Sequence, residues 1–262
     1  HNVITGLYDA LKDANPENEL FGYIGDESNT FLRDFVPVKI MDDELINAYR
    51  NSGGYDLLSS EKIGKDNFYR VLDVLNCANF TSFVIVGGDD SNTLSALITE
   101  YFHQNNGTHI TVIGVPATTH GNLKNKKIET TIGFDTAAKT FSQLVGNIQR
   151  DCMSSRKYWH FIRMKGRSAS HLVLEVALNT HPTWAIISEE VKAKNMTIYQ
   201  LANQIADLVE KRSKNGFNFG VLLLPEGILE LLEDIHTLVG ELNYFLIGEL
   251  KNISDFESQI YS

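Results

Sequence analysis

Two glycines and two aspartates stand where an apolar run gives way to a helical pattern, in residues 86–93 (VGGDDSNT). Glycine lets a backbone approach a ligand closely, and the free N–H groups at the start of a helix attract phosphate. Asp89 adds a carboxylate of the kind that holds Mg²⁺. The segment therefore predicts a phosphate site at Gly87 and Gly88 beside a magnesium ligand. A plain strand–turn–helix connection, with an aspartate capping the helix, is the alternative interpretation.

The elements that must position this loop alternate along the chain. Short apolar runs rich in β-branched and aromatic residues predict buried strands, and periodic amphipathic segments between them predict helices. The expected strands cover residues 83–86, 110–115, 158–162, 184–187 and 219–224. The expected helices cover residues 2–12, 44–50, 66–76, 92–104, 133–153, 168–179, 197–213 and 227–244. This order predicts an α/β fold with parallel sheets and helices on both faces. In such a fold ligands bind at the carboxyl ends of the strands.

Composition excludes several classes of partner. The 262 residues include 23 Lys and Arg against 33 Asp and Glu, a formal net charge of −10, whereas nucleic acids and anionic membranes attract basic surfaces. No apolar run reaches the roughly 18–20 residues of a membrane span. The 2 cysteines, Cys77 and Cys152, are too few for a disulfide framework. We therefore expect a cytoplasmic protein with no nucleic-acid or membrane partner.

Further motifs follow the GGDD of residues 87–90 in order along the chain. They are PATTHGNLKN at 116–125, GFDTA at 133–137, GRSASH at 166–171 and PEG at 225–227. Together these motifs resemble the phosphofructokinase family, in its long pyrophosphate-dependent branch. The resemblance implies a phosphofructokinase-like fold of two lobes, each a parallel sheet sandwiched by helices. The phosphoryl-donor side would occupy residues 1–135 and the sugar-phosphate side residues 136–262, in a chain truncated at both ends.

The resemblance also assigns roles to residues at matching positions. It implies Mg²⁺ as the cofactor, with Asp89 as a metal ligand. In this branch the second aspartate of GGDD, here Asp90, repels the α-phosphate of a nucleotide through like charge. Phosphate binding falls to Gly87, Gly88, Asp90 and Lys124, and sugar-phosphate binding to Lys165, Gly166, Arg167 and Glu226.

The sequence departs from the family where the chemistry is expected. The family's proton acceptor is the first aspartate of T-x-D-x-D and the second aspartate supports the metal, but these positions hold His120 and Asn122. An imidazole can accept a proton near neutral pH, yet it brings no negative charge to Mg²⁺. Losing such a group lowers rates by on the order of 10³–10⁶. A glycine-rich stretch also looks degraded at residues 21–31, where Asp26 and Glu27 would repel phosphate.

These departures predict a regulatory or structural α-type half that is inactive alone. We expect it to pair with a catalytic β-type half of the same enzyme in an oligomer, and to bind a sugar phosphate or an effector. An active phosphotransferase that uses His120 as its base is one alternative. A NAD or lipid kinase that shares only the GGD motif is another, although GFDTA and GRSASH speak against it.

Overall fold

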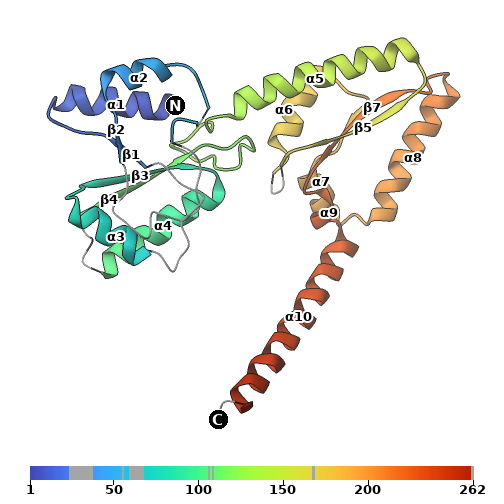
Figure 1. Ribbon diagram of the computed structural model, residues 1–262. Helices are drawn as coiled ribbons and strands as arrows, with labels where there is room; N and C mark the ends of the chain where they lie inside the picture. The colour runs from blue at the N-terminus through green and yellow to red at the C-terminus, as the bar shows by residue number, and fades with distance from the viewer. Residues whose placement is uncertain are drawn as a thin grey trace. The chain divides into compact units, whose positions relative to one another are not determined.

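The computed structural model describes residues 1–23, 38–54, 56–58, 68–105, 107, 109–166 and 169–260 (Figure 1). The chain forms two compact units. Unit 1 holds His1–Val86 and Asp90–Val115, and unit 2 holds Gly87–Asp89 and Pro116–Ser262. The predicted α/β class with parallel strands is confirmed. The division into lobes at residue 135 stays a prediction. Within the described ranges, no helix is long and apolar enough to cross a bilayer.

Unit 1 pairs helices with two small sheets. Its helices are α1 (Asn2–Ala14), α2 (Asp43–Tyr49), α3 (Phe68–Cys77) and α4 (Asp89–Gln104), and its strands are β1 (Phe21–Tyr23), β2 (Val38–Ile40), β3 (Ser82–Gly87) and β4 (Thr111–Pro116). β1 and β2 are antiparallel; sequence periodicity did not predict them, because three residues carry no readable pattern. β3 and β4 are parallel, since Thr111 N donates to Thr81 O and Ala117 N donates to Gly87 O with the same offset.

Apolar side chains from α3 and α4 make the main core of unit 1. Their spacing of three and four residues puts them on one face of each helix. The buried set is Phe68, Val71, Leu72, Leu75, Ile98, Phe102 and Ile110, and Phe83, Ile85 and Val112 of β3 and β4 pack against it. These contacts fix β3 against α3 and α4. The glycine loop follows β3 directly and leads into α4.

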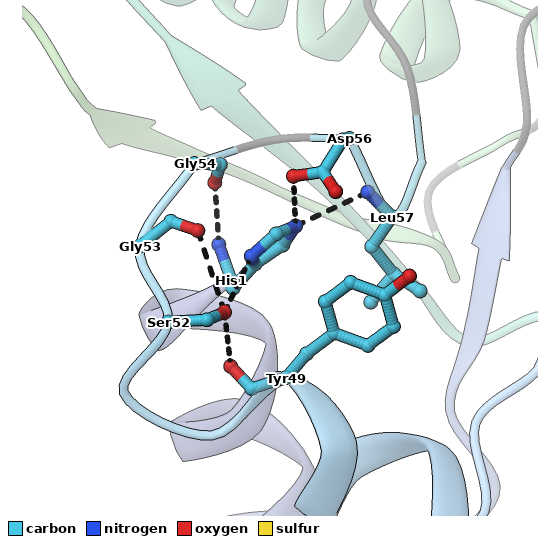
Figure 2. A network of polar contacts seen from close by, with 7 residues as sticks. All are labelled: His1, Tyr49, Ser52, Gly53, Gly54, Asp56 and Leu57. Carbon is cyan, nitrogen blue, oxygen red and sulfur yellow. Dashed lines mark hydrogen bonds and ion pairs between the residues drawn. The ribbon is translucent and has the colours of Figure 1, made fainter.

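A polar network anchors the start of α1 to the segment after α2 (Figure 2). The His1 imidazole is 2% exposed, and its Nε2 accepts the backbone N–H of Leu57 at 3.1 Å. The Asp56 carboxylate lies 3.2 Å from the same nitrogen, and Nδ1 lies 2.8 Å from Ser52 Oγ, to which it is hydrogen-bonded. Ser52 in turn donates to Tyr49 O at 2.7 Å. The chain of bonds fixes the imidazole and, through it, the first turn of α1.

Unit 2 is built on a three-stranded parallel sheet in the order β5–β7–β6. The strands are β5 (Trp159–Met164), β6 (Trp184–Ala185) and β7 (Gly220–Pro225), and the helices are α5 (Phe134–Ser155), α6 (His171–Thr180), α7 (Ser188–Ala193), α8 (Ile198–Lys214), α9 (Ile228–Leu231) and α10 (Glu233–Ile260). Alternate residues of β7 face opposite sides. Val221 and Leu223 join the core with α5 and α6, whereas Leu224 packs with α7, α8 and α9.

The single helix predicted over residues 227–244 is wrong, because the helix breaks at Leu232. That residue is extended, with φ −72° and ψ 133°, and its side chain is fully buried. Glu233 N donates to Met196 O at 3.0 Å, and Asp234 accepts the N–H of Ile198 at the start of α8. Burial of the Leu232 side chain and the hydrogen bond from Ile198 to Asp234 therefore stabilise the break in place of a continuous helix. Further along α10, Leu238, Val239 and Leu242 are exposed rather than core-facing.

Candidate functional site

The glycine loop joins β3 to α4 within three residues. β3 ends at Gly87 and α4 begins at Asp89, so the predicted strand–loop–helix junction is confirmed. Gly87 O accepts the N–H of Ala117 at 2.8 Å, which ties this loop to the segment after β4. At Gly88 an added Cβ would approach nothing closer than 4.0 Å. An added Cβ would therefore make ordinary van der Waals contact with Ala117 and Thr118, and phosphate binding at this helix N-terminus stays a prediction.

A short hydrogen bond links this loop to the segment that follows β4. Asn122 Nδ2 donates to Asp89 Oδ2 at 2.5 Å, across 33 residues of sequence. The carboxylate predicted to hold a metal therefore accepts a hydrogen bond from an amide at the position of the family's second aspartate. The two predicted site residues do meet, but as donor and acceptor rather than as two ligands.

The segment carrying His120 and Asn122 is shaped by its own backbone. Gly121 has φ +69°, and a Cβ there would lie 2.9 Å from the ring of Phe134, so only glycine fits without a shift. Thr118 is held at both ends: its Oγ1 accepts the N–H of His120 at 3.2 Å, and its carbonyl accepts the hydroxyl of the buried Thr131 at 2.7 Å. These bonds fix the half-buried His120 beside Asn122.

His171 is a hydrogen-bonded structural histidine that links two distant segments. As the first residue of α6, it brings its Nδ1 within 2.9 Å of Gly121 O, 50 residues away. Because a carbonyl only accepts, Nδ1 carries the proton and donates. Neither the spacing nor the composition of the sequence signals a bond over this distance. The contact ties the start of α6 to the His120 segment.

Three of the four predicted sugar-phosphate residues, Lys165, Gly166 and Glu226, lie at the carboxyl ends of β5 and β7. Met164 pairs in register with Pro225. Beyond this pair, Glu226 N donates to Met164 O at 2.8 Å and Gly227 N donates to Gly166 O at 3.3 Å. Lys165 and Glu226 consequently lie on adjoining strand ends with exposed side chains. This edge is where ligands bind in parallel sheets.

The remaining predicted site residues either are exposed side chains or lie outside the described ranges. Asp90 is exposed in the first turn of α4, and Lys124 is exposed in the segment after β4. Their predicted roles in phosphate binding stay predictions. Arg167, Asp26 and Glu27 lie outside the described residues.

The start of α6 is held by a carboxylate from α7. Glu189 Oε1 accepts the N–H of Ser170 at 2.9 Å, and Ser170 Oγ accepts the N–H of Ser188 at 2.9 Å. Burial raises the pKa of Glu189, but hydrogen bonds from Ser170 favour the charged form and more than offset it, so the pKa lies below its ordinary value. Glu189 is exposed, and its carboxylate also caps the turn before α6.

Glu189→Gln should destabilise the protein at neutral pH and remove part of its acid sensitivity. A depressed carboxyl pKa contributes stability above the unfolded value of about 4.3, and this contribution is lost as the pH falls through the folded pKa. The difference in unfolding free energy between wild type and variant should therefore shrink as pH falls from 7 towards 3. Urea unfolding across this range measures it. Glu190→Gln, at the adjacent exposed carboxylate, should show little of this effect, because Glu190 does not accept a hydrogen bond from Ser170. Equal pH dependence in the two variants would contradict the assignment.

The donors around Asp89 do not fit a resident Mg²⁺. In the part of the chain that the structure describes, no group of three or more His, Cys, Asp or Glu side chains could hold a metal ion. Mg²⁺ requires oxygen ligands in near-octahedral geometry. Asp89 turns one of its oxygens towards the amide N–H of Asn122, and an N–H group cannot ligate a cation. No chemical step is therefore assigned to magnesium in this chain.

Known proteins resemble this chain along nearly its whole length. A pyrophosphate–fructose 6-phosphate 1-phosphotransferase from Entamoeba histolytica is 46% identical over 99% of this chain and 48% of its own length. Two plant proteins of that name, a subunit beta 2 from Arabidopsis thaliana and a subunit alpha from Solanum tuberosum, are each 39% identical over 94% of this chain. The chain spans 43% and 40% of those subunits, so it covers less than half of each relative.

The fold comparison points the same way. A phosphofructokinase structure from Saccharomyces cerevisiae matches with a TM-score of 0.67 at 16% identity, over 92% of this chain and 35% of that one. At this identity the match concerns the fold alone. Residues 26–253 match the family model described as phosphofructokinase, a range that contains the glycine loop, the His120 segment and the strand ends of the candidate site. By fold and by sequence, the chain belongs to the phosphofructokinase family.

Proposed function

We propose that this chain is a regulatory or structural half of a pyrophosphate-dependent 6-phosphofructokinase, without catalytic activity of its own. It binds a sugar phosphate or an effector and pairs with a catalytic β-type half in a cytoplasmic oligomer. The identity to relatives named pyrophosphate–fructose 6-phosphate 1-phosphotransferase supports the branch. Identity does not choose between half types, because the alpha and beta subunits are equally similar to this chain.

The observation that carries the loss of catalysis is the pairing of Asn122 with Asp89. Phosphoryl transfer needs a group that accepts the proton of the attacking hydroxyl and positive charge that neutralises the phosphates. The His120 segment offers an imidazole and an amide in place of two carboxylates. The chain thereby loses both the negative charge that would attract a cation and the usual proton acceptor.

The retained backbone supports binding. Gly87 and Gly88 still lie between β3 and α4, and the strand ends that carry Lys165, Gly166 and Glu226 are joined by backbone hydrogen bonds. The sheet fixes the positions of these groups through backbone hydrogen bonds, and this does not require the missing carboxylates. Binding of a phosphorylated sugar is therefore expected to survive where transfer does not.

His120→Ala tests the loss of catalysis directly. The wild-type chain should show no turnover of pyrophosphate with fructose 6-phosphate, and the variant should not differ from it, because His120 is not the proton acceptor. A coupled assay for fructose 1,6-bisphosphate measures both. Turnover that disappears in the variant would establish the alternative, an active phosphotransferase that uses His120 as its base.

Binding is tested separately by thermal unfolding. A ligand at a hundred times its Kd stabilises the folded state by about 2.7 kcal/mol, so saturating fructose 6-phosphate should raise the melting temperature by several degrees. Arg167→Ala should remove most of that rise, whereas Arg150→Ala, at an exposed position of α5, should keep it. A melting temperature that NAD raises and fructose 6-phosphate does not would contradict the proposal.

A further inference from the structure

We infer that Asn122 takes the place of a divalent cation at this site, so that the chain binds its ligand independently of Mg²⁺. The inference starts from the bond between Asn122 Nδ2 and Asp89 Oδ2, at 2.5 Å. It uses the proposed function only for the identity of the ligand. The behaviour of the site towards cations can be measured without any ligand.

Electrostatics explains why an amide suits this position. Two carboxylates at the same separation would repel each other, and they would require a shared proton or a cation between them. An amide donor facing a carboxylate attracts it, and the pair keeps a single negative charge. With two carboxylates at positions 89 and 122, a cation would be needed to hold them together. With asparagine at position 122, the amide and the Asp89 carboxylate form a hydrogen bond without a cation.

The amide is also turned the wrong way to bind a metal. Its N–H faces Asp89, while Oδ1, the atom that could ligate a cation, is buried. A cation could be ligated by both Asp89 Oδ2 and Asn122 Oδ1 only after the short bond breaks and the amide rotates. Mg²⁺ tolerates little departure from octahedral oxygen geometry, so it would be a poor competitor.

Hydrogen bonds to the neighbouring backbone fix the position of Asn122. Its neighbour Gly121 is in the left-handed region, at φ +69°, and the carbonyl of Gly121 accepts a hydrogen bond from His171. Thr131 fixes Thr118 at the other side of the segment. The segment is therefore shaped by hydrogen bonds of the protein itself, and the site is formed before any ligand or ion arrives.

Mn²⁺ titration followed by electron paramagnetic resonance tests the inference on the full chain. The wild type should bind no Mn²⁺ tightly, whereas Asn122→Asp should bind one ion at least tenfold more tightly, because a second carboxylate then faces Asp89. The exchange variant Asp89→Asn with Asn122→Asp is the matched control. It has the same composition and net charge as the wild type, and it should also bind no Mn²⁺ tightly.

Ligand binding supplies the second measurement. The rise in melting temperature caused by fructose 6-phosphate should be the same in EDTA and in excess Mg²⁺ for the wild type. Tight Mn²⁺ binding by the wild type, or no gain in a folded Asn122→Asp variant, would overturn the inference. Should that variant not fold, the wild-type titration still decides. A wild type that binds neither cation nor sugar phosphate would contradict the proposed function and leave the cation result standing.

Discussion

Gly166→Ala is expected to destabilise unit 2 more than any other single methyl group added to a glycine there. Gly166 has φ +131°, a backbone conformation that side chains rarely adopt, and a Cβ would lie 2.5 Å from the backbone oxygen of Ala169. The strained dihedral costs about 1–3 kcal/mol, and the forced shift of Ala169 costs about 1–3 kcal/mol more. Arg167 directly follows Gly166 in the sequence, so fructose 6-phosphate binding should also be lost.

Urea unfolding followed by tryptophan fluorescence measures the effect, because Trp159 and Trp184 both lie in the sheet of unit 2. Gly146→Ala is the matched control. Gly146 lies within α5, where an added Cβ meets nothing within 4 Å, so the same substitution should stabilise by about 0.5–1 kcal/mol. Similar unfolding midpoints for the two variants would show that the backbone at Gly166 is not strained.

Leu222→Ala is expected to have the second large effect. Leu222 is 0% exposed and lies at the centre of the sheet, paired with Phe161 of β5 and with Trp184 of β6. Truncating a fully buried leucine loses its transfer free energy and leaves a cavity, at a cost of about 3–5 kcal/mol. The sheet that presents Lys165 and Glu226 should then unfold at a much lower urea concentration.

Leu178→Ala provides the comparison for this prediction. Leu178 lies on α6 and is 62% exposed, so the same truncation should change the unfolding free energy by no more than about 0.5 kcal/mol. A cost at Leu222 as small as that at Leu178 would mean that β7 is not the buried centre of the sheet.

The sequence predicted the elements whose pattern is strong. β7 is buried on both faces, so it appears as a continuous apolar run, and the predicted range 219–224 differs from Gly220–Pro225 by one residue. α8 begins at a capping box formed by Thr197 and Gln200. Such a box can be recognised in a sequence because its two residues lie only three positions apart. By contrast α7 has six residues, too few for a periodicity, and the sequence did not predict it.

The site was predictable in its residue types and not in its contacts. The substitution of both carboxylates is visible at His120 and Asn122 in the sequence itself. The bond from Asn122 to Asp89 spans 33 residues and the contact of His171 with Gly121 spans 50. Such pairs depend on how strand ends meet in the folded chain, and no local pattern records them.

The order β5–β7–β6 also constrains how unit 2 can fold as the chain is synthesised. β7 is the last of these strands in the chain and the central one in the sheet. Until its residues have left the ribosome, β5 and β6 have no strand to pair with in this sheet, and their apolar faces remain open to wrong partners. Closing such long-range pairs late is slow and favours aggregation. Nascent chains that end before Gly220 should therefore depend strongly on chaperones.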